Sequence, residues 1–207
     1  MKGSLIVILF FIAGVTVGYT GIAPKGIDYS EAATWTLYLL IGVIGLEFGY
    51  RNLASAIKSL NARTVMLPIC TIGGTILFAF FAALLLRRWS IFDYLAIGSG
   101  MGYYSLSSVL ITDYRKAAEG LDIATQLGTI ALLANIVREM LALLCAPLFH
   151  KLFGPYAPIS AAGVASIDVV LPVIARVCGS WGVPVAILHG VVVEVSVPVL
   201  VFLFCTL

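Results

Sequence analysis

Residues 165–172, which read ASIDVVLP, place the carboxylate of Asp168 inside a run that is otherwise apolar enough to lie in lipid. Ionisable side chains inside membrane segments are rare and usually functional. Pro172 has no N–H to bond the Asp168 carbonyl, so we expect the helix to open beside the charge. A carboxylate next to a free carbonyl suits a cation. The alternative is a structural ion pair with Arg176, about two turns later.

A second acid lies four residues before a proline near the C-terminus. Glu194 and Pro198 (EVSVP) repeat the spacing of Asp168 and Pro172 (DVVLP). Transporters often build sites from broken helices in corresponding segments. Short repeated patterns of this kind also arise by chance in Val-rich sequence. His189 is interpreted either as a proton-linked group or as a hydrogen-bonded histidine at a helix contact.

Three polar residues share another apolar segment, namely Asn135, Arg138 and Glu139. Their spacing sets Asn135 beside both charged residues. Arg138 and Glu139 are adjacent and point about 100° apart, so each should have a partner on another helix. Asp168 is the candidate partner for Arg138. The alternative is a charge network that only holds helices together.

Residues 98–108, GSGMGYYSLSS, hold more glycine and hydroxyl groups than a lipid-facing helix tolerates. Three alternate glycines favour an unwound or closely packed backbone. Small residues also pack helices tightly, which is the alternative reading. The rings of Tyr103 and Tyr104, with the hydroxyl of Ser105, favour a pocket, because aromatic rings can hold an alkylammonium group.

The composition is that of a polytopic membrane protein. Of the 207 residues, 61% are hydrophobic and 11% charged, and the mean hydropathy is +1.10. Such values exclude an ordinary soluble domain. A net charge of +2 without a basic stripe gives no indication of nucleic acid binding. We therefore predict an all-α integral membrane protein with one transmembrane domain over residues 1–207.

The apolar runs predict about seven transmembrane segments, with one or two discontinuous helices. The sixth is short and broken at Pro172, so a re-entrant hairpin is an alternative there. Glu47 ends the second and is an interfacial candidate. The expected segments lie near residues 5–20, 34–48, 65–86, 92–112, 124–149, 162–178 and 183–203.

The four cysteines lie singly in or beside apolar runs, without metal-ligand spacing or a nearby histidine. We interpret them as core residues. The sequence predicts neither a metal site nor a cofactor.

Five stretches resemble, in order, the prokaryotic lysine exporter family LysO. The resemblance implies export of L-lysine and its toxic analogue thialysine across the cell inner membrane. It also implies that membrane-embedded acids are critical, and Asp168 matches one of them. The stretches are LLIGVIGLEFGYR at 39–51, GSGMGYYSLSSVLIT at 98–112, LLANIVREMLALLCAPL at 132–148, GVASIDVVLPVIARVCG at 163–179 and VPVAILHG at 183–190.

Longer members of that family carry additional N-terminal spans, and with them another functional acid. We therefore expect either a small membrane protein that supplies these spans or a homo-oligomer. In the second case Glu47 or Glu194 would replace the absent acid, although neither matches a family signature.

Lysine needs an acid for its side-chain ammonium and N–H donors for its carboxylate. Asp168 suits the first role, and the glycine- and serine-rich segment could supply the second. Exporting a cation against an interior-negative potential costs about 2.3 kcal/mol per 100 mV. Proton antiport is the simplest compensation, with Asp168, Glu139 or both alternating between a proton and the ammonium group.

Two other functions remain open on the sequence, although we expect no enzyme. One is an intramembrane hydrolase with Ser105 or Ser107 as nucleophile and His189 as base. The other is a non-transporting subunit of a membrane complex.

Overall fold

The structure is a computed structural model that describes residues 62–179 and 181–207, together with residues 9, 13, 14, 16–20, 35 and 39. The described residues form helices and no strand. Most of the first two expected spans, and the candidate Glu47, lie outside them. The all-α prediction is confirmed for this part of the chain.

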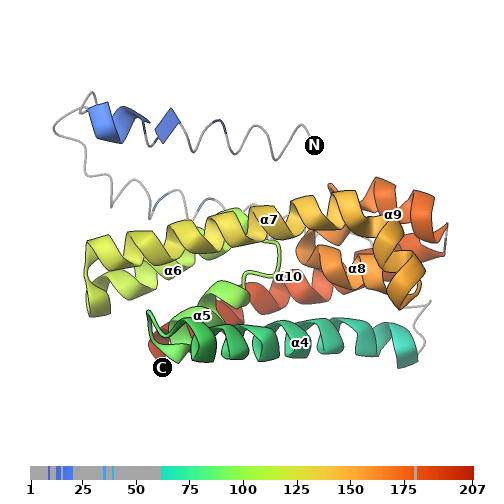
Figure 1. The fold of residues 1–207 in the computed structure, drawn as a ribbon, viewed down its shortest axis with the longest axis horizontal. Coiled ribbons are helices and arrows are strands. Elements are labelled where there is room, and N and C mark those ends of the chain that lie inside the picture. Colours follow the sequence, from blue (N-terminus) through green and yellow to red (C-terminus); the bar gives the residue numbers. More distant parts are fainter. Residues whose placement is uncertain are drawn as a thin grey trace.

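Three long apolar helices are each long enough to cross a membrane: α4 (Ala62–Leu86), α7 (Leu121–Phe153) and α10 (Gly182–Thr206). They coincide with the third, fifth and seventh expected segments. Consecutive spanning helices run in opposite directions (Figure 1). The predicted count of about seven crossings is not confirmed, since the described residues contain three such helices.

The fourth expected crossing is a hairpin. Helix α5 (Ile91–Gly98) is only about 12 Å long, and the chain then turns through residues 99–103 into α6 (Tyr104–Glu119). Arg115, near the end of α6, lies 2.6 Å from Asp93 at the start of α5. The legs therefore return to one end of the molecule, and the predicted crossing at 92–112 is wrong.

The sixth expected segment is a second hairpin, as its re-entrant alternative predicts. Its entering leg is α8 (Ala157–Ala162) followed by the 3₁₀ helix η1 (Gly163–Ile167), and its returning leg is α9 (Leu171–Cys178). The thiol of Cys178 donates to the Pro155 carbonyl at 3.3 Å, so these legs also return together.

The two prolines that follow acids behave differently. Pro172 lies in the first turn of α9, where a missing N–H costs nothing, and the helix is interrupted at Asp168 as expected. Pro198 lies inside α10, which continues to Thr206. The repeat of broken helices suggested by Glu194 and Pro198 is therefore absent.

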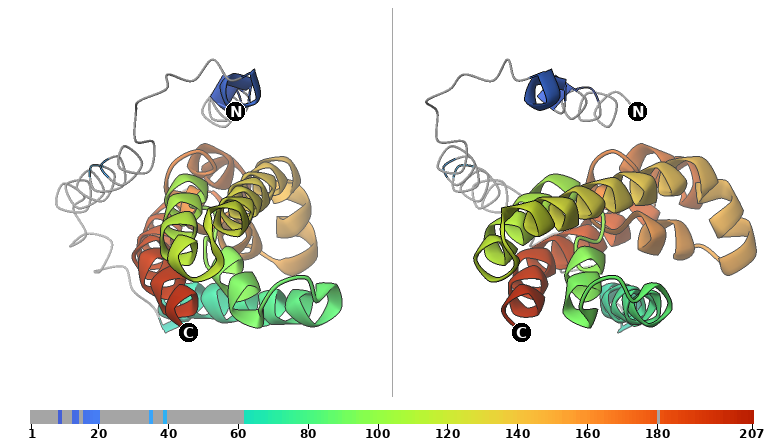
Figure 2. Two further views of the ribbon diagram at one scale, coloured as in Figure 1. Left: turned by 90° about the vertical axis from the view of Figure 1, so that its left-hand side faces the viewer. Right: turned by 60° about the vertical axis from the view of Figure 1, so that its left-hand side comes forward.

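Each hairpin follows a spanning helix after a short connection. Because α4 and α7 are antiparallel, the two hairpins enter the molecule from opposite ends (Figures 1 and 2). This order is an inverted repeat of the kind found in secondary transporters. Helices α7 and α10 contribute to the apolar core around both hairpins. The fold thus brings two hairpin tips together inside the molecule.

Candidate functional site

The site is organised by a contact between the two hairpin tips. The N–H of Val164 in η1 donates to the carbonyl of Met101 in the first tip at 3.0 Å. Gly163 has φ 61°, and a Cβ there would lie 2.1 Å from the Met101 oxygen. A Cβ on Gly102 would lie 3.0 Å from the Ala162 carbonyl oxygen. Glycine is therefore required on both sides for the backbones to meet.

Asn135 of α7 fixes the first tip. Its side-chain oxygen accepts from the Gly102 N–H at 2.6 Å, and its amide nitrogen donates to Ala131 O at 2.8 Å and to Ser107 Oγ at 3.4 Å. The amide thus satisfies a backbone donor that the turn leaves unpaired. Asn135 serves the hairpin rather than its charged neighbours.

Arg138 of α7 holds the second hairpin. Its Nε donates to Ala161 O at 3.0 Å and its Nη2 to Ser160 O at 3.2 Å, while Nη1 donates to Thr75 Oγ1 at 3.4 Å. Ser160 and Ala161 end α8, so the guanidinium lies at the negative end of that helix. Among the residues that the structure describes, no ion pair joins Arg138 to Asp168 as predicted. The guanidinium points instead to the carbonyls at the end of α8. Within the described residues no ion pair joins Asp168 to Arg176 either.

Three carboxylates from three elements line one cavity of roughly 130 Å³ beside the tips. Glu139 of α7 is 1% exposed and Glu194 of α10 is 6% exposed, whereas Asp168 at the end of η1 is exposed. Glu139 and its neighbour Arg138 therefore point to different surroundings, as their angular separation predicts. A cavity with three acids in an apolar protein is suited to a cation.

The start of α6 also lines this cavity, through Tyr103, Tyr104 and Ser105. The side chain of the N-cap residue, Tyr103, makes no capping hydrogen bond to α6. Its first N–H groups and the positive end of its dipole are suited to an anion. The cavity thus combines acids for a cationic group with a helix start for a carboxylate.

His189 lies apart from the acids. It is fully buried, with Nε2 at 2.9 Å from Thr71 Oγ1 of α4 and Nδ1 at 3.4 Å from Ser166 Oγ of η1. Ser107 Oγ instead donates to Tyr103 O at 2.7 Å. No hydrogen bond joins His189 to Ser105 or Ser107 in the described part of the chain, so the suggested dyad is not assembled.

The predicted site residues that lie in the described part of the chain therefore divide into two sets. Six line the cavity, and three hold the hairpins from neighbouring helices. The tip contact between Val164 and Met101 was not predicted, and the glycine at 163 beside it is the only signal that could have indicated a close backbone approach. The first set is Tyr103, Tyr104, Ser105, Glu139, Asp168 and Glu194, and the second is Asn135, Arg138 and His189.

A family model described as lysine exporter LysO matches residues 8–205. The chain is 29% identical over 195 residues to the lysine exporter LysO of Escherichia coli K12. The aligned region covers 93% of this chain and 61% of that protein, so the chain spans less than two thirds of its length. It is also 29% identical over 174 residues to a proposed lysine exporter of Haemophilus influenzae, with 82% of each chain covered. No solved structure matches.

Proposed function

We propose that this chain, which belongs to the lysine exporter LysO family, exports L-lysine and its analogue thialysine across the inner membrane in exchange for protons. The observation that carries the proposal is the cavity shared by Glu139, Asp168 and Glu194. Membership of an exporter family and three apolar helices of membrane-spanning length support a multi-pass membrane transporter.

In the proposed complex, the side-chain ammonium of lysine lies among the three carboxylates. Asp168 is its main partner, because it ends η1 at a helix interruption and is the most exposed of the three acids. The substrate carboxylate lies at the start of α6, where backbone N–H groups and the helix dipole favour an anion. The rings of Tyr103 and Tyr104 flank the aliphatic stem.

Proton exchange follows from the same acids in this proposal. A carboxylate that holds the ammonium group in one state and a proton in the other couples the two movements. Asp168 and Glu139 are the proposed coupling groups, since one is exposed and the other buried beside the same cavity. Exchange for protons offsets the cost of about 2.3 kcal/mol per 100 mV for each outward positive charge.

We further propose that a second polypeptide completes the transporter. The chain spans 61% of the length of the Escherichia coli exporter that it matches. A small membrane protein that supplies additional spans is the first choice, and a homo-oligomer is the second. Split parts of a membrane protein can reassociate through helix packing and interhelical hydrogen bonds.

The test is efflux of radiolabelled lysine from native cells, which supply the proposed second polypeptide, when they carry the wild-type chain, Asp168→Asn or Asp122→Asn. Asp122 is an exposed acid in the first turn of α7, outside the cavity, and serves as the matched control. Loss of a charged hydrogen-bond partner of about 1.5–3 kcal/mol should lower efflux about tenfold or more in Asp168→Asn. Membrane abundance is checked by immunoblot, and thialysine competition reports the substrate range.

Wild-type efflux from Asp168→Asn would remove this residue from the mechanism. The two-component part is tested separately with the purified chain in liposomes under a pH gradient. Little lysine transport is expected from the chain alone, and full transport would contradict the need for a second polypeptide.

A further inference from the structure

His189 is a buried titratable group that the proposed proton exchange does not use. Described residues alone enclose its ring, which is 0% exposed. Its Nε2 lies 2.9 Å from Thr71 Oγ1 of α4, and its Nδ1 lies 3.4 Å from Ser166 Oγ of η1. Thr71 Oγ1 in turn forms a hydrogen bond with Ser160 Oγ of α8. The ring therefore joins α10 and α4 to the entering leg of the second hairpin.

Helix α10 holds η1 on one face. The Ser166 hydroxyl donates to Ala186 O at 3.0 Å. A Cβ added to Gly190 would overlap Ile167 Cγ2 and lie 2.8 Å from Ser166 Oγ, so the absence of a side chain lets η1 come this close. Ala186, His189 and Gly190 have the spacing i, i+3 and i+4, which places them on the same side of the helix. These contacts fix where η1 lies along α10.

The hydroxyl protons identify the tautomer of the ring. A serine hydroxyl has one proton, and Ser166 directs it to Ala186 O in the shorter of its two contacts. Ser166 Oγ then accepts from His189, so Nδ1 carries the ring proton. Nε2 accepts from Thr71 Oγ1, because the other acceptor of that hydroxyl, Leu67 O at 3.0 Å, lies within α4 and has a helical N–H donor. Both nitrogens are thus paired in an uncharged ring.

The elements that His189 joins carry two of the three acids. Asp168 follows Ser166 by two residues at the end of η1, and Glu194 follows His189 by five residues, about 7.5 Å along α10. Both acids line the same cavity. A shift of η1 on α10 therefore changes the separation of the two carboxylates. The attraction of each carboxylate for an ammonium group falls with distance, so the affinity of the cavity depends on this packing.

We propose that His189 is a positioning residue for lysine export: as the neutral Nδ1–H tautomer it fixes η1 between α10 and α4, and it thereby sets the position of Asp168 relative to Glu194. The inference rests on the proposed function, in which these acids hold the lysine ammonium group. His189 does not line the cavity, so it acts through Ser166. Its Nδ1 acts on the hairpin, and its Nε2 orients the ring from α4.

The experiment uses substitutions that keep one nitrogen each. The side-chain amide of Asn can take the place of Nδ1, and that of Gln the place of Nε2. Ser166→Ala removes the hydroxyl that accepts the Nδ1–H. Ser196→Ala is the matched control, since Ser196 of α10 also donates to a backbone carbonyl but lies outside the cavity lining.

The first measurement is the uptake of radiolabelled lysine by inside-out vesicles from native cells in which the variant replaces the wild-type chain. Uptake is followed against lysine concentration under a fixed pH gradient. The half-saturating concentration should rise about fivefold in His189→Gln and Ser166→Ala, with the maximal rate within about twofold of wild type, because Asp168 is displaced but present. His189→Asn should recover most of the wild-type half-saturation, and Ser196→Ala should match wild type.

The second measurement is amide hydrogen exchange of the purified chain in lipid nanodiscs, which needs no lysine. Exchange of residues 164–170 should rise in His189→Gln and Ser166→Ala and stay low in His189→Asn. Ser166→Ala keeps the ring, so it carries both comparisons if a histidine variant does not reach the membrane.

A wild-type half-saturating concentration in Ser166→Ala would overturn the proposal, and so would a defect in His189→Asn equal to that in His189→Gln. A lower maximal rate with unchanged half-saturation would assign the ring to helix packing alone and would overturn it too. Wild-type vesicles that take up no lysine would contradict the proposed function, whereas hydrogen exchange would still decide whether His189 fixes η1. The two failures are therefore distinguishable.

Discussion

The two hairpins have the same position in the inverted repeat, but their open ends are closed by different forces. The α5–α6 hairpin is closed by a buried ion pair, and the α8–α9 hairpin by one thiol hydrogen bond and an aromatic contact. This difference predicts that the two hairpins open with unequal ease.

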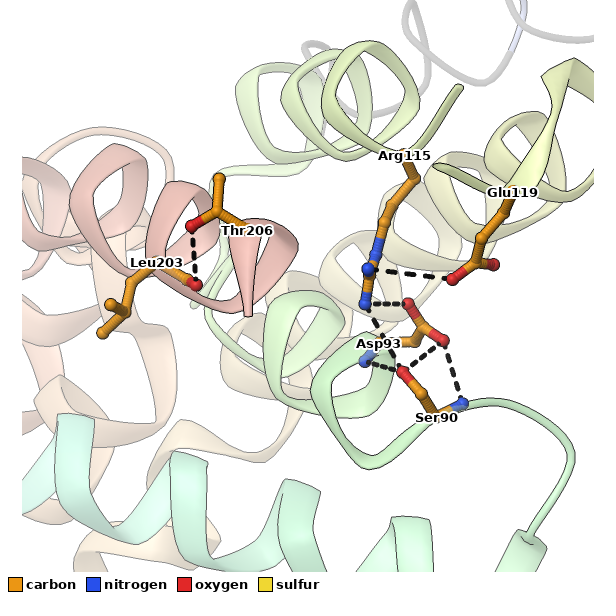
Figure 3. A network of polar contacts seen from close by, with 6 residues as sticks. All are labelled: Ser90, Asp93, Arg115, Glu119, Leu203 and Thr206. Atoms are coloured by element: carbon orange, nitrogen blue, oxygen red, sulfur yellow. Dashed lines mark hydrogen bonds and ion pairs between the residues drawn. The ribbon is translucent and has the colours of Figure 1, made fainter. Parts of the chain in front are cut away.

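In the first hairpin, Asp93 is 2% exposed and lies 2.6 Å from the Arg115 guanidinium (Figure 3). Its other oxygen accepts from the Ser90 N–H at 2.9 Å, and Ser90 Oγ accepts from the Asp93 N–H at 3.2 Å, which together form a capping box at the start of α5. Arg115 also approaches Glu119 at 3.7 Å. Charged groups therefore join the two legs, and separating them costs free energy because buried charges would lose their partners.

The second hairpin has no ion pair between its legs in the described residues. Its open end is held by the bond from Cys178 to Pro155, and the Tyr156 and Trp181 rings meet edge to face at 5.4 Å. Such contacts contribute about 1 kcal/mol each. We therefore expect the α5–α6 hairpin to act as a scaffold and the α8–α9 hairpin, which carries Asp168, to open more easily.

The largest expected effect is that of Arg115→Gln, which leaves Asp93 buried without its cation. Removing one partner of a buried pair costs about 3–5 kcal/mol. The measurement is thermal unfolding in detergent, with Lys116→Gln as control, because Lys116 pairs with Asp113 at a more exposed site and should contribute about 1 kcal/mol or less. The double variant Asp93→Asn, Arg115→Gln should recover part of the loss. Equal unfolding temperatures for wild type and Arg115→Gln would abolish the contrast between the hairpins.

An intermediate effect is expected for Gly163→Ala, which forces the tips apart at the Met101 carbonyl. Gly154→Ala is the control, because Gly154 has φ 89° and ψ 179°, a conformation open essentially to glycine alone, but open space where a Cβ would lie. It should cost only the backbone strain of about 1–3 kcal/mol. Gly163→Ala should lower the unfolding temperature further and reduce lysine efflux. If both variants behave alike, the tip contact contributes nothing measurable.

The smallest effect, and the most specific one, is expected for Trp181→Leu. Loss of the ring contact with Tyr156 should cost about 0.5–1.5 kcal/mol and raise amide hydrogen exchange in α9 while α5 stays protected. Trp89→Leu is the matched variant at the first hairpin, where Trp89 meets Tyr94 at 5.9 Å. It should leave exchange in α5 low because the ion pair remains. Increased exchange in both hairpins would show that their closures are equivalent.

Part of the candidate site was predictable because it depends on local chemistry. A carboxylate in an apolar run marks a site whatever the fold, and the interruption at Asp168 follows from a proline that ends a helix or begins the next one. The glycine-rich segment was recognisable as unwound. The contact of this segment with η1 was not predictable, because the Val164 N–H meets the Met101 carbonyl only after both hairpins have folded.

The sequence by itself determined the three spanning helices, because a run of about 20 apolar residues is stable in a bilayer only as a helix of that length. The tertiary structure decided which other apolar segments turn back, since the legs α5 and α9 are about as apolar as the spanning helix α7. It also directed Arg138 to the end of α8 rather than to Asp168, and it kept α10 continuous through Pro198. Helix packing alone, which no local pattern encodes, brought Glu139, Asp168 and Glu194 to one cavity.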